Sequence, residues 1–544
     1  MAVVGKSVFR ISCFAPRWRQ PLQEWHSYAR HRYRTISKAL GESSAFEKAS
    51  GGSLTCGVRV TEEKYGMSQS VDQTDSQGAS VALPMPRSAD SGSISARLDR
   101  LPGSRAVWTL IAILSLGFFF ELYDLLFTGY IAPGLVRDGI LTATTTGLFG
   151  TTGIASFIAA LFLGLFVGTI TCGFLADRFG RKPIFSCALI WYAVANTVMA
   201  MQSSASGLIE WRFISGMGIG VELVTIGTYI SELAPKHLRG RAFAISQTVG
   251  FCAVPVVAFL SYLLVPIAPL GASGWRWVVL AGGSGALFIW WFQRNLIESP
   301  RWLASKGRFQ EADAVLGALE SRIEAQYGRA LPPPGPSEPV VRKGAFRDMW
   351  QPPYRGRTLM LIVFHIFQTV GFYGFANWVP TLLVSQGITV TSSLLYTSII
   401  GLAAPVGPLL GFWFADRLER KHVIVVMAGV NVICGLVFSH LSRPSLIVAI
   451  GVCLTLAGNI ISFSYHAYQQ ELYPTAIRAR AVGFVYSWSR LSAVFSSFII
   501  ALMLKDFGVI GAFSFIAGAM VVVMITIGIF GPRTKGASLE SISH

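Results

Sequence analysis

The sequence predicts an all-α integral membrane protein whose twelve transmembrane helices form two six-helix halves that repeat each other in tandem. Three observations predict this fold class: a low content of charged residues, a series of long apolar segments, and two motifs that recur at one fixed offset. Charged residues make up 13% of the chain and hydrophobic residues 52%. Soluble domains carry about 25% charged residues, so the composition excludes a soluble protein.

The apolar segments are long enough to cross a bilayer, because a membrane-spanning helix needs about 20 predominantly apolar residues. In chain order the expected spans cover residues 106–130, 152–175, 183–201, 208–231, 242–266, 276–296, 358–384, 392–415, 422–441, 445–468, 480–503 and 509–530. Because the number of spans is even, both ends of the chain are expected on the same side of the membrane.

Two motifs recur at one offset, which indicates that half of the protein was duplicated. The Glu-x-x-Pro-x-x-x-Arg motif that begins at Glu232 returns at Glu471, and the Asp-Arg pair that begins at Asp177 returns at Asp416. Both pairs lie 239 residues apart (471 − 232 and 416 − 177). A repeat of this length is a half-protein rather than a solenoid unit.

The formal net charge of +17 does not indicate nucleic-acid binding, because the basic residues fall in short loops between the spans. The loops after spans 2, 4, 8 and 10 hold eleven of them: Arg178, Arg181, Lys182, Lys236, Arg239, Arg241, Arg417, Arg420, Lys421, Arg478 and Arg480. The opposite loops hold four: Arg137, Arg276, Arg443 and Lys505. Basic loops favour the cytoplasm, so we expect both termini to be cytoplasmic.

The polar ends and the middle complete the expected organisation. Residues 1–104 form a polar tail with no apolar period, which predicts disorder. Its Arg- and Ser-rich start leaves two alternatives open: an organelle-targeting segment, or a bacterial inner-membrane protein whose real start is Met67, which we favour. Residues 105–296 and 358–531 hold the two halves.

The halves are joined by a cytoplasmic linker over residues 297–357, and residues 532–544 form a cytoplasmic tail. Between Ala312 and Ile323 the apolar residues of the linker recur at helical spacing, which predicts an amphipathic helix. A proline-rich stretch that begins at Pro332 then favours an extended chain.

The loop after span 2 carries the strongest family signal. It reads Gly173-Phe-Leu-Ala-Asp177-Arg178-Phe-Gly180-Arg181-Lys182. This sequence resembles the signature loop of the major facilitator superfamily, and the resemblance extends over residues 105–542. It implies the major facilitator fold, with a substrate cavity between the two halves.

Finer motifs resemble two branches of that superfamily. The Glu-Ser-Pro-Arg motif at Glu298, and a Pro-x-Thr-Lys-Gly-x-Ser-Leu-Glu motif at Pro532, resemble the sugar-porter-like branch. Span 1, which contains Glu121-Leu-Tyr-Asp124, and span 7, which contains Asn377-Trp378-Val-Pro, resemble the aromatic-acid, niacin and metabolite:proton symporters.

In the resembled family the charged loops latch the cytoplasmic ends of the two halves together, and the latch opens in each cycle. The corresponding residues are Gly173, Asp177, Arg178, Gly180, Arg181, Lys182, Asp416, Arg417, Glu232, Arg239, Glu471, Arg478, Glu298 and Arg301. Glycine at position 180 tolerates a positive φ, and Asp177 can lie at a helix N-terminus, where the helix dipole favours negative charge. A solvated turn that only sets topology is the alternative.

Three carboxylates lie deep in apolar spans, where an ionisable side chain by default marks an ion or proton path. Glu121 and Asp124 lie one turn apart on one face of span 1, and Glu222 lies in span 4. We expect Asp124 to carry the proton, with Glu121 as its partner and Glu222 as a second candidate. The alternative for each is a structural role in the bundle.

Five residues are expected to bind substrate. Arg490 is a cation inside a span of the second half, and a buried guanidinium can bind a carboxylate in a bidentate manner. Tyr373, Asn377 and Trp378 of span 7 are expected to line the cavity, where the aromatic rings can stack on a substrate ring. Arg212 in span 4 either contacts the substrate or pairs with an acid of span 1.

These features predict a secondary active transporter, not an enzyme, that takes up a small organic anion with a proton by alternating access. We expect an aromatic or nicotinate-like carboxylate; a sugar or polyol carrier of the same fold is the main alternative, and a drug exporter or a non-transporting receptor are further ones. No metal site is expected, because the seven cysteines show no metal-ligand spacing. No cofactor is expected, because the proton gradient supplies the energy. The expected partners are the substrate, protons and the lipid bilayer, and a monomer suffices.

Overall fold

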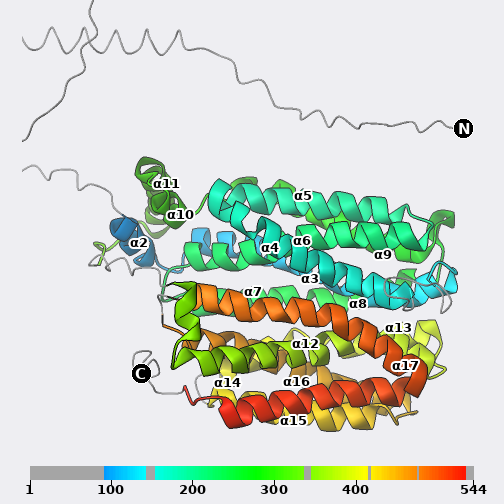
Figure 1. Cartoon of the computed structure of the whole chain (residues 1–544). Coiled ribbons are helices and arrows are strands. Elements are labelled where there is room, and N and C mark those ends of the chain that lie inside the picture. Colours follow the sequence, from blue (N-terminus) through cyan, green and yellow to red (C-terminus); the bar gives the residue numbers. More distant parts are fainter. Residues whose placement is uncertain (1–90, 142–152, 336–344, 415–417, 475–476, 535–544) are drawn as a thin grey trace, which may run out of the picture. The chain divides into compact units, whose positions relative to one another are not determined.

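The regular elements of this chain are helices throughout the part that the structure describes (Figure 1). The structure is a computed structural model, and it describes residues 91–534 apart from 142–152, 336–344, 415–417 and 475–476. The expected disorder before residue 91, the alternative start at Met67 and the tail after residue 534 therefore lie outside the described residues. The described helices belong to one compact unit.

The helices follow the order of the predicted spans. The first half consists of α3 (Arg105–Arg137), α4 (Gly153–Phe179), α5 (Arg181–Ala200), α6 (Ala205–Leu233), α7 (Arg239–Phe251), α8 (Ala253–Leu264), the short η2 (Pro269–Gly271), α9 (Gly274–Phe292) and η3 (Gln293–Asn295). After η4 (Phe346–Trp350) of the linker, the second half consists of α12 (Tyr354–Ser385), α13 (Val390–Gly401), α14 (Val406–Phe414), α15 (Arg420–Phe438), α16 (Pro444–Glu471) and α17 (Arg478–Phe530).

The twelve-span fold is confirmed. Within the described ranges, ten helical segments are long and apolar enough to cross a membrane. One of them, Arg480–Phe530, is broken at Gly508, whose φ of 66° does not fit a helix, so it supplies spans 11 and 12. The nineteen-residue α9 supplies span 6, which brings the number to twelve.

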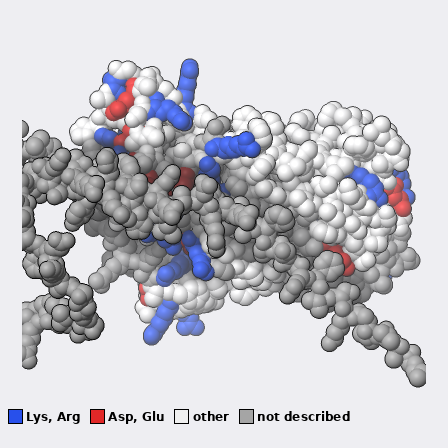
Figure 2. Space-filling view, turned by 90° about the horizontal axis from the view of Figure 1, so that it is seen from above, with Lys and Arg blue, Asp and Glu red and all other residues white. Residues whose placement is uncertain are grey.

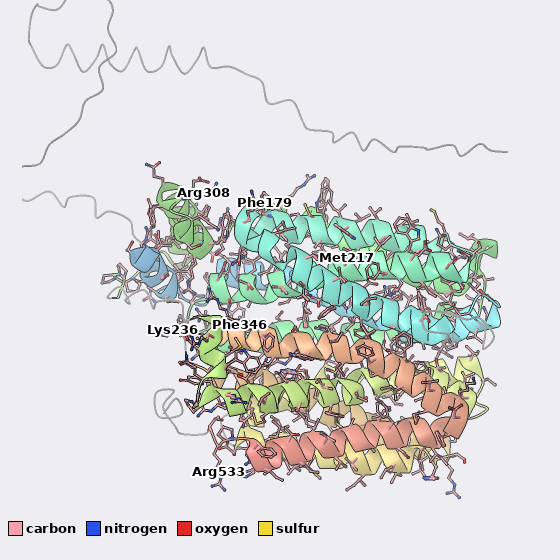
Figure 3. The ribbon with its side chains drawn as sticks, in the orientation of Figure 1. Phe179, Met217, Lys236, Arg308, Phe346 and Arg533 are labelled. Carbon is pink, nitrogen blue, oxygen red and sulfur yellow. The ribbon has the colours of Figure 1, made fainter. Side chains whose placement is uncertain are left out.

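Charged side chains gather at one end of the helices, which we call the charged end. It is formed by the end of α4, the starts of α3, α5, α7 and α12, and the end of α16. Figure 3 places Lys236, Arg308 and Arg533 at this end, whereas Met217 lies midway along the bundle. On the face shown in Figure 2, most charges lie toward the same end and the middle is largely uncharged, as a bilayer requires.

Residues 91–104 depart from the expected disordered tail. They begin with the helix α2 (Ser91–Asp99), and the segment buries Ile94, Leu98 and Leu101. Arg97 and Arg100 of this segment each bond Glu320 at 2.7 Å. Burial alone would raise the pKa of the Glu320 carboxyl, but the hydrogen bonds from the two arginines outweigh it and hold that pKa below its usual value.

The partner of α2 is the linker. Asp99 accepts a hydrogen bond from Arg301 of α10 (Pro300–Ser305) at 2.7 Å. Glu320 belongs to α11 (Phe309–Tyr327), which is the amphipathic helix expected from the apolar spacing and which buries Leu316 and Ile323. A short polar segment gives no sign of such a distant partner, so composition alone suggested disorder.

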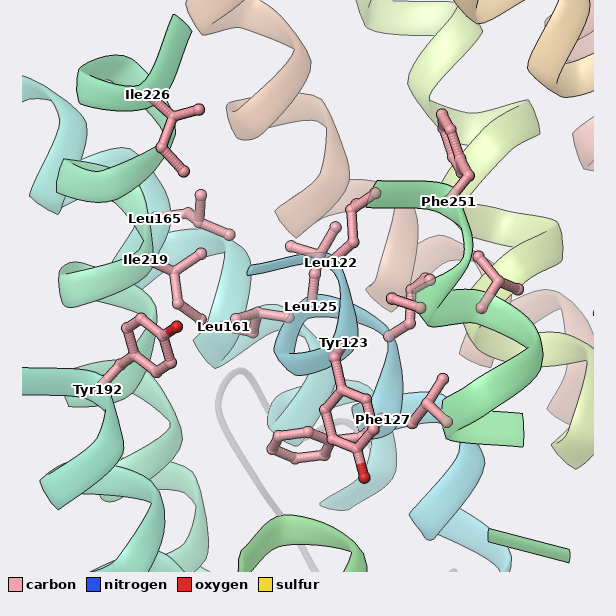
Figure 4. Packing of buried hydrophobic residues seen from close by; sticks show 14 of the residues in the cluster. Leu122, Tyr123, Leu125, Phe127, Leu161, Leu165, Tyr192, Ile219, Ile226 and Phe251 are labelled. Carbon is pink, nitrogen blue, oxygen red and sulfur yellow. The ribbon is translucent and has the colours of Figure 1, made fainter. Parts of the chain in front are cut away.

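The first half packs around α3 (Figure 4). Leu125 of α3 lies close to Leu161 of α4, and Phe251 lies at the bend between α7 and α8. Glycines let α4 and α6 approach closely: a Cβ atom at Gly216 would overlap the carbonyl oxygen of Leu161. Small residues at such contacts are typical of packed membrane helices.

Candidate functional site

Three adjoining cavities follow the axis of the bundle between the two halves. The entrance cavity lies toward the charged end, has a volume of about 470 Å³ and is lined by the starts of α7 and α17. The central cavity, about 90 Å³, shares Gln247, His466 and Arg490 with it. The apolar cavity, about 70 Å³, lies farther from the charged end and shares Phe251 and Phe372 with the central cavity.

Beyond the cavities, the two halves touch. A Cβ atom at Gly129 of α3 would overlap the carbonyl oxygen of Asn377 of α12 and would lie 2.7 Å from the Cα of that residue. Gly129 lies 24 residues after Arg105 (129 − 105), or about 35 Å along the helix. The path is therefore open toward the charged end and closed by backbone contact at the opposite end.

Arg490 of α17 supplies the positive charge of the central cavity. It is 3% exposed and donates to the hydroxyl oxygens of Tyr373 at 2.9 Å and Tyr486 at 3.0 Å. Its Nε has no hydrogen-bond partner in the described part of the chain, and among those residues it has no carboxylate within 4.0 Å. A guanidinium binds a carboxylate through charge-assisted hydrogen bonds, and the unpaired Nε leaves this guanidinium able to bind an anion.

Glu121 of α3 supplies the negative charge of the same cavity. It is 2% exposed and reaches the central cavity from the first half, whereas Arg490 reaches it from the second. Its Oε2 has no hydrogen-bond partner among the described residues. Movement of one half against the other therefore changes the relation between this carboxylate and the Arg490 guanidinium.

Asp124 lies one turn farther along α3, and both of its carboxylate oxygens accept hydrogen bonds within the first half. Its Oδ1 accepts from Arg212 at 2.7 Å and its Oδ2 accepts from Ser215 at 3.1 Å. Arg212 also donates to Thr128 at 2.6 Å and lies 4.3 Å from the ring centre of Phe127. Arg212 therefore forms the pair with Asp124 that the sequence left open, and it is not a cavity residue.

Glu222, Asn377 and Trp378 also lie outside the central cavity. Glu222 of α6 is buried in the first half near Tyr192, with neither carboxylate oxygen bonded to a described donor. Asn377 lies one turn beyond Tyr373 on α12, where the backbones of the two halves meet. Trp378 is 2% exposed within the packed core. Asn377 and Trp378 were expected to contact substrate, but neither of them lines the central cavity.

Several polar residues of the central cavity were missed by the sequence analysis. Gln247, Gln368, His466 and Tyr486 all line it. His466 donates from Nδ1 to the carbonyl oxygen of Ser462 at 2.7 Å, which leaves Nε2 as the acceptor of a neutral ring. For His466 the signal was a stripe of polar residues at helical spacing on the apolar span 10, which marks a face turned away from lipid: Asn459, Ser462, His466 and Gln469.

The loop after α4 is held by ion pairs within the first half. Arg181 bonds Asp177 at 2.6 Å and Glu232 at 2.8 Å. The carboxylate at the N-terminus of α5 is Glu298, which accepts from the backbone N–H of Arg181 at 3.0 Å, and not Asp177 as the sequence suggested. The favourable interaction with the helix dipole therefore comes from the segment after span 6.

The second half repeats this pairing. Arg420 bonds Glu471, and both lie 239 residues after the pair of Arg181 and Glu232 (420 − 181 and 471 − 232). Asp416 and Arg417 lie outside the described residues. The ion pairs given for the described residues each lie within one half or within the segment formed by α2 and the linker, so in this state none of those pairs latches the halves together.

The remaining charged-end residues have separate environments. Gly173 lies within α4 and Arg239 begins α7. Arg178 is exposed and lies 5.4 Å from the ring centre of Phe179. Lys182 donates to the carbonyl oxygen of Arg294 at 3.4 Å, and Arg478 donates to that of Tyr473 at 3.1 Å.

Replacement of Gly180 by alanine is expected to destabilise the charged end. Gly180 has a φ of 113°, and a Cβ atom there would lie 2.5 Å from Oε2 of Glu298. The strain of a non-glycine residue in this conformation is of order 1–3 kcal/mol, and displacement of Glu298 adds to it. Thermal unfolding of the purified variant should shift downward by several degrees. Gly240→Ala is the control, because nothing lies within 4 Å of that position; equal stability of the two variants would contradict the expectation.

Comparison with known proteins agrees with this architecture. The sugar (and other) transporter family matches residues 108–544. The chain is 32% identical over 445 residues to the metabolite transport protein YyaJ of Bacillus subtilis, across 81% of this chain and 96% of that protein. It is 29% identical over 450 residues to the niacin transporter NiaP of Acinetobacter baylyi, across 82% and 98%.

A solved structure shares the fold. The inward open conformation of the xylose transporter XylE from E. coli superposes with a TM-score of 0.63 at 18% identity, across 80% of this chain and 99% of that one. The chain belongs to the sugar (and other) transporter family and has the major facilitator fold, and it is a multi-pass membrane protein that acts as a secondary transporter and not as an enzyme.

Proposed function

We propose that the protein is a proton-coupled symporter of a small aromatic or nicotinate-like carboxylate. The observation that carries the proposal is the buried Arg490, which two tyrosine hydroxyls hold in the central cavity without a carboxylate within 4.0 Å among the described residues. A guanidinium binds a carboxylate through two parallel hydrogen bonds. The niacin transporter at 29% identity supports an acid of this size.

The body of the substrate is proposed to lie in the apolar cavity. Phe251 and Phe372 line both this cavity and the central one, and their ring centres lie 6.2 Å apart at an edge-on angle. Aromatic rings prefer such arrangements, so a ring attached to the carboxylate finds suitable contacts there. A sugar would lose hydrogen bonds in this environment.

The proton is proposed to travel on Glu121 rather than on Asp124. The Glu121 carboxyl group and the Arg490 guanidinium line the same cavity. An ionised Glu121 therefore balances the charge of the guanidinium while the cavity is empty. A substrate carboxylate would bring a second negative charge to one cation, and two carboxylates in such a site cannot both stay ionised. Protonation of Glu121 removes the conflict, so the anion and the proton enter together.

Asp124 is proposed to have a structural role. Its pair with Arg212 is buried, with both side chains no more than 1% exposed. Breaking a buried pair leaves an uncompensated charge, which is strongly destabilising.

The positive-inside bias of the loops supports a cytoplasmic charged end, so the described state would be open to the cytoplasm. An inner membrane metabolite transport protein of Escherichia coli, 30% identical to this chain, supports the inner membrane as the location.

Uptake into proteoliposomes with an alkaline interior tests the proposal. Wild type is expected to accumulate radiolabelled benzoate or nicotinate, and a protonophore should abolish the accumulation. Glu121→Gln should still exchange substrate across the membrane but should not accumulate it in response to the pH gradient. Asp124→Asn should instead lower the amount of folded protein, whatever the gradient.

Other outcomes would reassign the protein. Gradient-driven accumulation that survives in Glu121→Gln but disappears in well-folded Asp124→Asn would move the proton to Asp124. Uptake of glucose or xylose in place of the acids would make the protein a sugar carrier. Gln247 and Gln368 of the central cavity would then bind the hydroxyl groups.

A further inference from the structure

The wall of the apolar cavity carries a polar atom that the proposed mechanism does not use. Asn459 of α16 lines this cavity and is 3% exposed. Its amide nitrogen Nδ2 donates to the carbonyl oxygen of Thr455 at 2.9 Å. This bond fixes the orientation of the amide, because only the NH2 group can donate. Oδ1 is therefore left as a buried acceptor with no partner in the described part of the chain.

The hydroxyl group of Thr397 does not compete for this role. Thr397 lines the same cavity, but its hydroxyl donates to the carbonyl oxygen of Ser393 at 2.7 Å. Among the described residues that line the apolar cavity, Oδ1 of Asn459 is the buried side-chain polar atom that lacks a hydrogen-bond partner. Buried polar groups are normally paired, so this oxygen points to a ligand that donates a hydrogen bond.

Asn459 and Arg490 line different parts of the joined cavities, Asn459 the apolar cavity and Arg490 the central one. His466 lines the central cavity together with Arg490, and Asn459 lies seven residues earlier on the same helix as His466 (466 − 459). Seven residues correspond to about 10 Å along a helix axis. A single six-membered ring fits this spacing if it carries a carboxylate at one end and a polar substituent at the other.

We propose that Asn459 sets substrate specificity by accepting a hydrogen bond from a donor on the ring, opposite the carboxylate that Arg490 binds. This inference rests on the proposed function. A hydroxyl or amino group in the 4-position satisfies Oδ1. An unsubstituted ring leaves Oδ1 unpaired, and the ring nitrogen of isonicotinate presents a second lone pair to it. A site built around one hydrogen bond discriminates strongly against analogues that lack the partner.

Uptake of three acids by the full-length chain in proteoliposomes tests the inference. With an alkaline interior, wild type should take up 4-hydroxybenzoate about 5- to 150-fold faster than benzoate or isonicotinate, the range expected for one buried acceptor left unpaired. Asn459→Leu keeps a similar volume but removes the acceptor, so its rates for 4-hydroxybenzoate and benzoate should become about equal. Thr397→Val is the matched control, because that hydroxyl is already bonded within its own helix; it should keep the wild-type preference.

The outcomes separate this inference from the proposed function. Equal uptake of benzoate and 4-hydroxybenzoate by wild type, or an unchanged preference in Asn459→Leu, overturns the role of Asn459 and leaves carboxylate symport in place. Loss of all uptake in Asn459→Leu alone assigns Asn459 to structure and also overturns the inference. If wild type takes up none of the three acids, the proposed function fails and the inference fails with it.

Discussion

Replacement of Gly129 by valine is expected to abolish net transport without unfolding the protein. In the described state a Cβ atom at Gly129 would overlap the backbone of Asn377, so α3 and α12 could no longer close the end of the path that lies opposite the charged end. Overpacking of this kind disfavours a state by about 1–3 kcal/mol, which shifts a two-state equilibrium by about 5- to 150-fold. The variant should therefore remain open at that opposite end.

Thiol labelling measures this shift directly. Ala376 lines the apolar cavity, and in a cysteine-free background Ala376→Cys should be protected from a membrane-impermeant reagent added at the end opposite the charged end. Addition of Gly129→Val should expose it. Gly518→Val is the control, because Gly518 is exposed on α17 with nothing within 4 Å. Full transport activity together with unchanged protection in Gly129→Val would contradict closure by the contact between Gly129 and Asn377.

The second large effect is expected at Arg490. Arg490→Gln should reduce uptake of an aromatic acid by about 100-fold or more, because the loss of one member of a buried charge pair weakens binding by several kcal/mol. Arg490→Lys should also fail, since an ammonium group cannot bind a carboxylate with two parallel hydrogen bonds. The measurement is substrate binding to purified protein by calorimetry, together with the initial rate of uptake.

Two further variants define what the Arg490 result means. Lys505→Gln removes an exposed positive charge from the same helix and should leave binding unchanged. Tyr486→Phe removes one of the two hydroxyl groups that hold the guanidinium, so a smaller loss of affinity is expected. Wild-type affinity in Arg490→Lys would mean that the anion is bound elsewhere.

The fold could be predicted from the sequence because few backbone structures satisfy their own hydrogen bonds inside a bilayer. Long apolar segments must be helices there, and an offset of 239 residues between matching motifs revealed the duplication. The structure repeats that offset in three dimensions, since Arg181 pairs with Glu232 and Arg420 pairs with Glu471. The repeated motifs, the apolar spans and the repeated ion pairs therefore all indicate two matching halves of membrane-spanning helices.

The site was only partly accessible. The sequence singled out Glu121, Tyr373 and Arg490, which line the central cavity, because ionisable and aromatic groups stand out in apolar spans. The sequence did not decide which carboxylate of span 1 pairs with Arg212, because Glu121 and Asp124 lie one turn apart and the outcome depends on how α3 is rotated against α6. The spacing along α12 likewise does not show where the central cavity ends, so Asn377 was assigned to it.

The opposite charges of Glu121 and Arg490 in one cavity have a consequence for energetics. If the cavity is neutral when empty, it is neutral again when it carries one monocarboxylate and one proton. The membrane potential then acts on neither crossing, and the pH difference alone drives accumulation, by at most about tenfold per pH unit. A cell that uses such a carrier could harvest monocarboxylates from acidic surroundings even when its membrane potential has collapsed.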